Sequence, residues 1–263
     1  MYPLNNKYIL DVATEAAISG ARIVMDALGS TMIADHKGRT DLVTDIDRRS
    51  EQVIKSLLRK QFPDHDIVAE ESGNELMESD YCWFIDPLDG TTNFVHGYPS
   101  FGISIGLFHH NKPQVGVVRE MPAMNLYTAT AGTGSYCNNM PIHVSLTDDL
   151  VRSLLVTGFG YEHGNNWEKN MLLFKQLTDT TQGVRRLGAA AVDLCHVASG
   201  MVDGFWEFDL KPWDTAAGIL IAFEAGANVS RLDGSEYSIF DDQILVTNGI
   251  IHQSMVDKMI GFL

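Results

Sequence analysis

The first third of the chain alternates between helical and strand-like hydrophobic patterns. In residues 7–28 the apolar side chains recur mostly at three- and four-residue steps, and Gly29 follows. This period is typical of an amphipathic helix, which glycine commonly ends. A second helix is predicted at about 44–61. The short apolar runs 66–69 and 81–85 predict buried strands that carry acidic residues at their C-terminal ends.

The pattern then changes twice. Residues 101–143 alternate apolar and small side chains around turn sequences at 110–113, 132–134 and 137–139, which predicts an antiparallel meander. Beyond a strand at 154–157, helices and strands alternate. The predicted helices are 167–177, 189–199, 213–225 and 251–260, and the predicted strands are 204–208, 227–232 and 244–246.

These elements predict an α/β (mixed α+β) protein of layered sheets and helices. No repeat, low-complexity tract or linker interrupts the chain. We therefore expect an N-terminal α+β lobe (1–145) and a C-terminal α/β lobe (146–263), packed as one globular unit.

Charge and composition exclude several classes of function. The 263 residues have a formal net charge of −15, so DNA, RNA and anionic membranes would be repelled over most of the surface. The three cysteines are far apart in the sequence and form no C-x-x-C motif, which argues against a disulfide framework. Without a signal-peptide pattern or an apolar run long enough to span a membrane, a cytoplasmic protein is expected.

The densest chemical motif is the string 86–94, Asp-Pro-Leu-Asp-Gly-Thr-Thr-Asn-Phe, which directly follows a predicted strand. Pro87 lacks an N–H, so the segment is not expected simply to continue the sheet, and the Leu88 carbonyl is left free to bind an ion. Hard oxygen ligands of this kind suit Mg²⁺. Gly90 permits close backbone approach, and the residues after it can start a helix whose N–H groups face an anion. The string predicts a cation site beside a phosphate site.

Other acids have both a structural and a chemical interpretation. Glu70 and Glu71 end a predicted strand, where they are either solvated or part of the site. Asp214 begins a predicted helix and would suit its dipole. Asp47 stands three residues after Thr44, a spacing that is also typical of a capping box.

Taken together, these blocks resemble the inositol monophosphatase family. The similarity lies at residues 41–44 with Asp47, at 70–72, at 83–94 and at 213–214, and the spacing between the blocks, the chain length and a glycine-rich segment at 188–191 also match. The resemblance implies an α-β-α-β-α layered sandwich of the inositol monophosphatase and fructose-1,6-bisphosphatase type. It also implies a lithium-sensitive, Mg²⁺-dependent phosphatase that forms a homodimer.

The resemblance also implies roles for individual residues. Glu70, Asp86 and the Leu88 carbonyl would hold one Mg²⁺, while Asp86, Asp89 and Asp214 would hold a second, and a third, weaker ion near Glu70 would make two or three per active site. The catalytic residues would be Asp47, Glu70 and Thr91, with the Asp47–Thr91 pair orienting the attacking water and helping to deprotonate it. The substrate-binding residues would be Asp89, Gly90, Thr91, Ala190 and Glu207.

The expected activity is hydrolysis of myo-inositol monophosphate, a small-molecule phosphate ester. In the family a glutamate seven residues before the last metal aspartate binds sugar hydroxyls, and Glu207 has that spacing from Asp214. The same mechanism acting on fructose 1,6-bisphosphate or on the 2′-phosphate of NADP remains an alternative. So does a regulatory protein that binds the transcription machinery.

Two other motifs are rejected on context. Residues 102–106 fit G-x-S-x-G, but the chain after Ser104 continues a strand pattern where a nucleophile elbow needs a helix. The adjacent His109 and His110 are expected to point to opposite faces of a strand, which argues against a zinc site.

Overall fold

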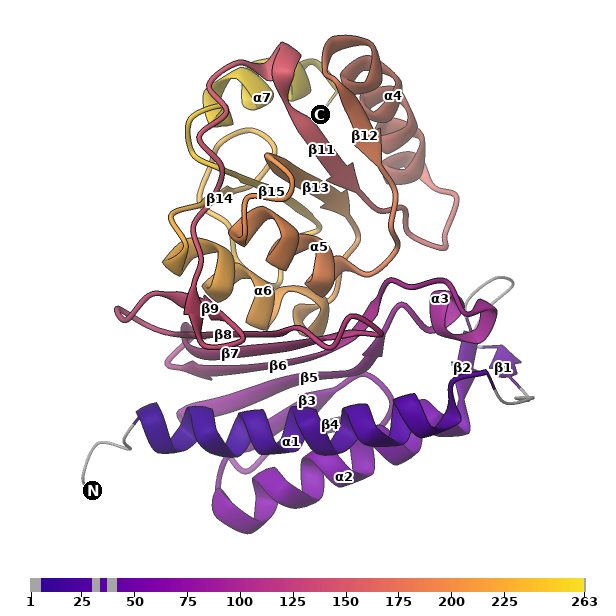
Figure 1. The fold of residues 1–263 in the computed structure, drawn as a ribbon, viewed down its shortest axis with the longest axis vertical. Coiled ribbons are helices and arrows are strands. Elements are labelled where there is room, and N and C mark those ends of the chain that lie inside the picture. Colours follow the sequence, from indigo (N-terminus) through magenta and orange to yellow (C-terminus); the bar gives the residue numbers. More distant parts are fainter. Residues whose placement is uncertain (1–5, 30–33, 37–41, 263) are drawn as a thin grey trace.

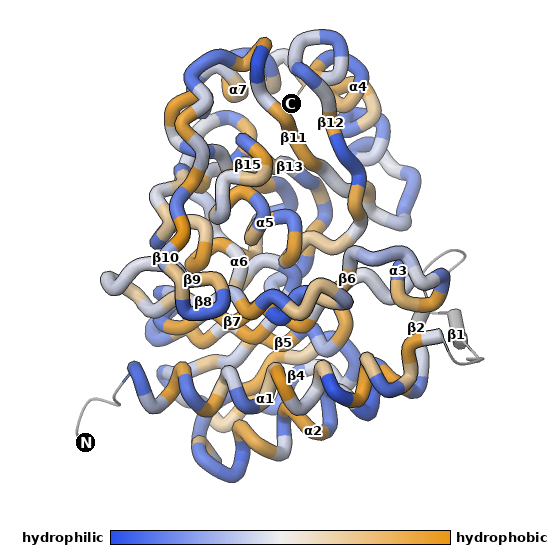
Figure 2. The backbone as a smooth tube through the Cα atoms, viewed as in Figure 1, coloured by the Kyte–Doolittle hydropathy of each residue, from blue (hydrophilic) through white to orange (hydrophobic). Residues whose placement is uncertain are grey.

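Helices and sheets alternate in five layers, which confirms the predicted mixed α+β sandwich (Figure 1). The computed structural model describes residues 6–29, 34–36 and 42–262. From one side to the other, the layers are α1 with α2, an eight-stranded sheet, α5 with α6, a five-stranded sheet, and α4 with α7. Three hydrophobic clusters fill the spaces between these layers. Hydrophobic segments run through the strands and inner helices, as Figure 2 shows.

The two N-terminal helices cover the outer face of the larger sheet. Helix α1 (Asn6–Ala27) and helix α2 (Asp45–Gln61) match the predicted ranges closely. Thr44 caps α2: its side chain accepts the Ile46 N–H at 3.1 Å, and Asp47 accepts the Thr44 N–H at 2.8 Å. The predicted capping box is therefore present.

The eight-stranded sheet contains the predicted meander. Its strand order is β10-β9-β8-β7-β6-β5-β3-β4, and β3 and β5 are parallel. The sequence analysis missed β4 and a small separate sheet of β1 and β2. The strands are β1 (Ala34–His36), β2 (Leu42–Thr44), β3 (Asp66–Ala69), β4 (Gly73–Glu75), β5 (Tyr81–Asp89), β6 (Phe101–His109), β7 (Lys112–Met121), β8 (Leu126–Thr130), β9 (Ser135–Cys137) and β10 (Met140–Pro141).

The predicted strand 81–85 was too short, and the segment with Pro87 continues the sheet only with an irregularity. Strand β5 runs on to Asp89, but its register against β6 shifts between Asp86 and Asp89. Asp86 pairs with Ser104 and Asp89 with Gly102, so Pro87 and Leu88 form an irregularity in the ladder. A bulge therefore accommodates the missing N–H of proline while the strand continues.

The C-terminal elements form the remaining layers. The five-stranded sheet has the order β12-β11-β13-β15-β14, and the sequence analysis missed its edge strand β12. Apart from β12 (Gly183–Arg185), the elements of this part of the chain fall at the predicted positions within a few residues. They are α3 (Thr91–His96), β11 (Leu154–Thr157), α4 (Asn165–Thr180), α5 (Ala190–Ala198), β13 (Gly204–Phe208), α6 (Pro212–Glu224), β14 (Asn228–Ser230), β15 (Gln243–Thr247) and α7 (His252–Met259).

Helix α6 lies directly on the larger sheet because two strand glycines leave room for it. A Cβ atom on Gly106 would lie 2.8 Å from Ala216, and one on Gly116 would lie 2.6 Å from the Ala217 carbonyl oxygen. At the start of the helix, the Trp213 carbonyl accepts the Ser104 hydroxyl at 3.2 Å. Ser104 is thus a buried strand residue that anchors α6, as the rejection of a nucleophile elbow requires.

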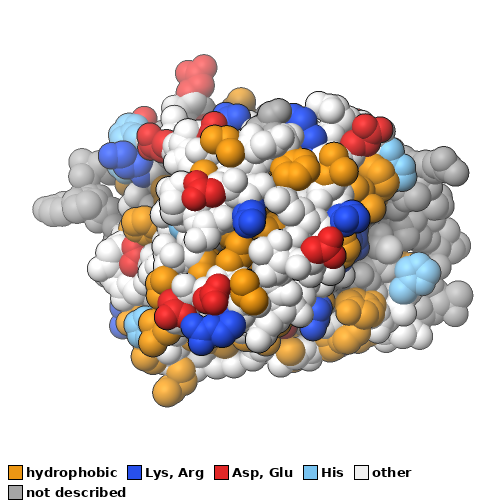
Figure 3. Space-filling view, turned by 90° about the horizontal axis from the view of Figure 1, so that it is seen from above, with side chains coloured by type: hydrophobic (Ala, Val, Ile, Leu, Met, Phe, Trp, Pro, Cys, Tyr) orange, Lys and Arg blue, Asp and Glu red, His pale blue; other side chains and the backbone are white. Residues whose placement is uncertain are grey.

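The surface shows no concentration of one charge on the face seen in Figure 3. Acidic and basic side chains are interspersed there with apolar ones. Among the described helices, none is both long enough and apolar enough to cross a lipid bilayer.

Candidate active site

A cavity of about 900 Å³ collects most of the acidic residues singled out in the sequence. The ends of β3 and β5 and the start of α3 form one wall. The start of α6, the end of β13 and the loop before α4 form the other. The lining residues include Glu70, Glu71, Asp86, Leu88, Asp89, Gly90, Thr91, Ala190, Glu207 and Asp214.

The bulge in β5 holds Asp86 and Asp89 in fixed positions. Asp86 accepts the Leu88 N–H at 3.0 Å, and the Ser50 hydroxyl donates to the Pro87 carbonyl at 2.9 Å. Asp89 accepts the N–H groups of Ala190 and Ala191 at 3.2 and 2.8 Å. These are amides from the first turn of α5, where N–H groups have no partner within the helix. The C-terminal half of the chain thus orients an acid from the N-terminal half.

Burial and mutual repulsion raise the pKa of these acids. Burial is the largest cause for Asp86, followed by the neighbouring charges of Glu70, Asp89 and Asp214. Burial likewise raises the pKa of Asp89 to about 7, against the lowering effect of the Ala191 N–H. The pKa of half-buried Asp214 is raised chiefly by burial, with Glu70 and Asp89 adding to it. An enclosed group of carboxylates with raised pKa values is typical of a site that binds cations.

The donors present fit a hard divalent cation. They are carboxylate oxygens and one backbone carbonyl, that of Leu88, and Mg²⁺ prefers such oxygen ligands. Among the described residues, no three of these carboxylates bring oxygens within 4.8 Å of one another. Mg²⁺ usually keeps several waters, so a site for it does not need three protein carboxylates in contact with one another.

Asp47 takes part in the cap of α2 and also contacts Thr91. One carboxylate oxygen takes part in the cap of α2, and the other accepts the Thr91 hydroxyl at 2.9 Å. The Thr91 hydroxyl also lies 3.1 Å from the Leu88 carbonyl. Because Asp47 is 1% exposed and Thr91 is 9% exposed, this pair is shielded from bulk water but borders the cavity.

Gly90 lets the chain turn from β5 into α3 without obstructing the cavity. Its φ of 85° lies in the left-handed region, which glycine adopts at little cost. A Cβ there would lie 3.0 Å from the Ser100 carbonyl oxygen and 3.2 Å from the Ala189 Cβ. The N–H groups of the first turn of α3 therefore lie beside the acids, in an arrangement that can bind an anion.

Glu70 and Glu71 are positioned by a residue that the sequence analysis did not single out. The buried Glu51 of α2 accepts the N–H groups of Glu71 and Ser72 at 2.8 and 3.0 Å. The Glu70 N–H donates to the Ile85 carbonyl at 3.2 Å, which joins the end of β3 to β5. No sequence signal marks Glu51, because its partners lie on another element. Asp41, part of one block that matched the family, lies outside the described residues.

Glu207 and Ala190 also line the cavity. Glu207 is 7% exposed, and a Cβ on Gly158 would lie 2.2 Å from its carboxylate oxygens. Burial and then Asp214 raise the pKa of Glu207, whereas Arg186 lowers it. Within the part of the chain that the structure describes, no group donates a hydrogen bond to the Glu207 side chain. The carboxylate is therefore available to a ligand in the cavity.

The sequence analysis also missed Arg186 and Asp193. Arg186 and Lys211 are the cationic residues that line the cavity. Asp193, in α5, is fully buried, and both of its carboxylate oxygens lack a hydrogen-bond partner. Burial raises the pKa of Asp193, and Glu207 and Asp89 raise it further. Neither residue belongs to a recognisable motif. The segment 159–166, whose role the sequence does not indicate, supplies many of the residues that line the cavity. It consists of the loop before α4 and the first two residues of that helix.

The two roles of Asp47 can be separated by mutation. Thr91→Val removes the hydroxyl that hydrogen-bonds Asp47, so kcat is expected to fall about 10²-fold if the pair handles a proton. Thr44→Ala removes the side chain that caps α2 and its hydrogen bond to the other Asp47 oxygen, but leaves the Thr91–Asp47 hydrogen bond, so it is expected to lower the free energy of unfolding by about 1 kcal/mol while kcat stays within a few-fold of wild type. Steady-state kinetics and urea unfolding of both variants measure this. Equal losses of kcat in the two variants would contradict the assignment.

Comparison with known proteins agrees with this geometry. Residues 5–260 match the model of the inositol monophosphatase family. The chain is 49% identical over 259 residues to "Phosphatase IMPL1, chloroplastic" of Arabidopsis thaliana, covering 96% of this chain and 70% of the relative. It is 46% identical over 248 residues to the inositol-1-monophosphatase of Synechocystis, covering 94% and 86%.

Other relatives carry different names. A fructose-1,6-bisphosphatase/inositol-1-monophosphatase of Aquifex aeolicus is 39% identical, with 94% of each chain covered. A putative Nus factor SuhB of Neisseria meningitidis is also 39% identical, with 91% and 93% covered. The structure of inositol monophosphatase from Anabaena superposes with a TM-score of 0.89 at 42% identity, covering 97% of this chain and 96% of that chain.

One conclusion follows from the match over almost the whole length, from the shared fold and from the acids that line one cavity. The chain belongs to the inositol monophosphatase family and is a phosphatase.

Proposed function

We propose that this protein is a Mg²⁺-dependent phosphomonoesterase that hydrolyses myo-inositol monophosphate to inositol and phosphate. The observation that carries the proposal is the group of enclosed carboxylates beside the first turn of α3, facing Glu207 across one cavity. Anionic substrate would be repelled by these acids alone, so cations are needed to bring a phosphate ester there.

The cation ligands are those that the resemblance to the family implies. Glu70, Asp86 and the Leu88 carbonyl would hold one Mg²⁺, and Asp86, Asp89 and Asp214 would hold another, with a third, weaker ion near Glu70. When bound, Mg²⁺ neutralises charge on the phosphate and lowers the pKa of a coordinated water.

The chain's own residues supply orientation and proton transfer. The Thr91 hydroxyl, itself held by Asp47, would accept a hydrogen bond from the attacking water and align it with the phosphorus atom. The proton would pass from the water towards Thr91 and Asp47, while Glu70 borders the same part of the cavity as a second acceptor. The N–H groups of Gly90 and Thr91 would bind the phosphate oxygens through the first turn of α3.

The residues proposed to contact the substrate, Glu207 and Ala190, favour a polyol. A buried carboxylate without a protein donor, such as that of Glu207, is matched by the hydroxyl groups of a sugar or inositol ring. Ala190 lines the same cavity and has no polar side-chain group, so it would contact the ring through its methyl group.

Phosphate release from a panel of substrates tests the activity. The panel contains inositol 1-phosphate, fructose 1,6-bisphosphate, NADP and histidinol phosphate, each with Mg²⁺, with chelator, and with Mg²⁺ plus lithium. We expect release that needs Mg²⁺, is inhibited by lithium and is fastest with inositol 1-phosphate. Faster release from fructose bisphosphate or NADP would retain the mechanism and reassign the substrate. No release from any of them would favour the regulatory alternative that the relative named as a Nus factor suggests.

Glu207→Gln tests directly whether Glu207 binds the hydroxyl groups of the substrate. We expect KM for inositol 1-phosphate to rise about tenfold, because an amide accepts ring hydroxyls less well than a carboxylate. A small aryl phosphate that has no ring hydroxyls should show an unchanged KM. The matched control is Glu162→Gln, which removes an exposed carboxylate from the same cavity. A similar rise in KM for both variants and both substrates would contradict a specific role of Glu207.

The remaining expectations stay predictions. They are a homodimer, a cytoplasmic location and the absence of binding to DNA, RNA or membranes.

A further inference from the structure

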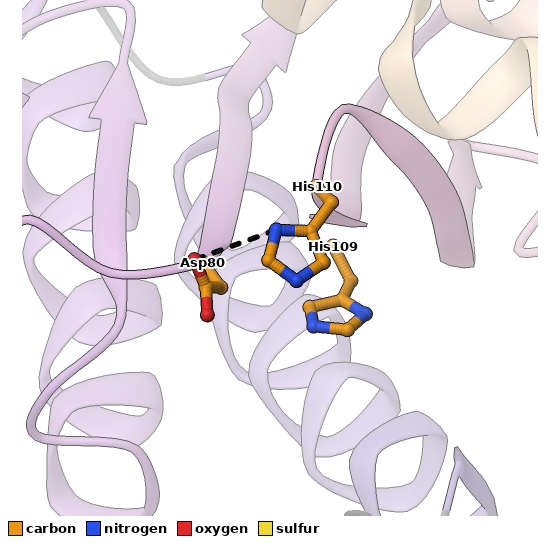
Figure 4. Close-up of side chains that lie close together, drawn as sticks. All are labelled: Asp80, His109 and His110. Atoms are coloured by element: carbon orange, nitrogen blue, oxygen red, sulfur yellow. Dashed lines mark ion pairs between the residues drawn. The ribbon is translucent and has the colours of Figure 1, made fainter.

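A second cluster of chemically active side chains lies outside the large cavity. Asp80, His109 and His110 place one potential ligand atom each within 4.8 Å of one another, and they alone do so among the described residues. None of the three lines the cavity of the candidate active site. Figure 4 shows His110 facing Asp80, with His109 beside it.

This arrangement corrects the expectation that the two histidines point to opposite faces. Strand β6 ends at His109, and the side-chain alternation of a strand ends there too. His110 and Asn111 have φ values of 48° and 60°, so they form a two-residue turn in the left-handed region. The turn brings the His110 ring to 4.2 Å from the His109 ring, at an interplanar angle of 38°.

Backbone and ring contacts hold the three residues in place. The His110 N–H donates to the Asp80 carbonyl at 2.9 Å. The His109 ring stacks on Tyr81 at 4.2 Å and 14°, and Tyr81 in turn stacks on the buried ring of His65 at 4.7 Å and 9°. Because these contacts limit the freedom of the side chains, less entropy is lost when they bind a common ligand.

We propose that Asp80, His109 and His110 form a binding site for one Zn²⁺ ion. Two imidazoles and a carboxylate are typical zinc ligands, and three protein ligands leave a coordination position for water. Bond lengths of about 2.1 Å place tetrahedral ligand atoms about 3.4 Å apart. The His110 Nδ1 and the Asp80 Oδ1 already lie 3.4 Å apart, and a ring nitrogen of His109 lies within 4.8 Å of a ligand atom of each.

The ligand types separate this site from the one in the large cavity. Oxygen-only ligands suit Mg²⁺, whereas imidazole nitrogen favours Zn²⁺ and its neighbours in the first transition row. Asp80 and His110 also line a smaller cavity of about 530 Å³, which Pro212 and Trp213 close on another side. The Zn²⁺ ion would thus be open to solvent. It would lie apart from the carboxylates of the large cavity, which are proposed to bind Mg²⁺.

Zinc binding to the whole protein tests the proposal. In equilibrium dialysis with Mg²⁺ present in excess, we expect the double variant His109→Gln/His110→Gln to bind one Zn²⁺ fewer than wild type. Asp80→Asn should weaken that binding about tenfold or more. His143→Gln, which removes an exposed histidine elsewhere, should bind zinc as wild type does.

A spectroscopic probe distinguishes ligation from loose association. Cu²⁺ added in one equivalent should show nitrogen hyperfine coupling in the electron paramagnetic resonance spectrum of wild type, and this coupling should be lost in the double variant. Circular dichroism of the variants should match wild type, since Asp80 and His110 are exposed and His109 is only half-buried. Equal zinc stoichiometry and affinity in wild type and the double variant would overturn the proposal.

Discussion

Replacing Asp89 with asparagine is expected to lower kcat roughly 10³-fold or more while leaving the fold intact. The change keeps the side chain's shape but removes the charge that would hold a cation. The carbonyl oxygen of the introduced amide can still accept one of the two α5 N–H groups that Asp89 now accepts, those of Ala190 and Ala191. Steady-state kinetics at saturating Mg²⁺ measures the loss, and far-ultraviolet circular dichroism checks the fold.

Asp11→Asn is the matched control. It makes the same chemical change at an exposed position of α1, far from the cavity, and should retain wild-type kcat. If Asp89→Asn turned over substrate at the wild-type rate, the assignment of Asp89 to the reaction would be wrong.

The second large effect concerns stability without divalent cations. In the presence of chelator, Asp86→Asn is expected to be more stable than wild type at pH 8 and close to wild type at pH 4. Burial and the charges of Glu70, Asp89 and Asp214 raise the pKa of Asp86 well above its ordinary value. At pH values between the pKa of Asp86 in the unfolded chain and its higher pKa in the folded protein, the folded protein holds a proton that the unfolded chain has released. The stability of wild type therefore falls as pH rises through this range. Asparagine cannot titrate and therefore removes this loss.

Wild type and Asp86→Asn must be compared with each other because buried histidines change the pH dependence of stability in the opposite direction. Burial lowers the pKa of His65 to about 4 and also lowers that of His252. For these groups the unfolded chain binds more protons than the folded one, so stability rises with pH over the same range. Since wild type and Asp86→Asn share both histidines, the difference between their thermal unfolding curves isolates the carboxylate.

Mg²⁺ should reverse the order of the two proteins at pH 8. At about 100 times its dissociation constant, a ligand that binds only the folded state adds about 2.7 kcal/mol. For a chain of this size that corresponds to a rise in Tm of roughly 5 to 10 °C. We expect this rise in wild type and a much smaller one in Asp86→Asn. Identical melting curves of wild type with chelator and with Mg²⁺ would contradict a cation site at these acids.

Local sequence signals were sufficient for most of the fold. Hydrophobic period, capping residues and glycine turns located α1, α2, the meander and the alternating second half, because these features depend on neighbouring residues. Strands β4 and β12 were missed because each is a short edge strand whose pairing is decided by a distant partner. The continuation of β5 through Pro87 was misjudged for a related reason, since the bulge depends on β6.

The site was predictable where its residues form a motif. The string 86–94 and its acidic companions drew attention through their order in the chain, and the structure brings them to one cavity. Glu51, Arg186 and Asp193 carry no such signal, because each matters through partners far away in sequence. The prediction that His109 and His110 point to opposite faces was wrong for another reason. It assumed that the alternation of a strand includes His110, but β6 ends at His109.

The two walls of the large cavity differ in how freely they can change. The acids at the ends of β3 and β5 are fixed by a bulge, by amides of α5 and by Glu51, so under the proposed mechanism a substitution among them would disturb the reaction itself. The segment 159–166, made of the loop before α4 and the first two residues of that helix, lines the same cavity and supplies none of these supports. Substrate preference can therefore diverge through that loop, by insertion or recombination, while the chemistry is inherited unchanged. This separation makes the scaffold readily evolvable towards other phosphate esters.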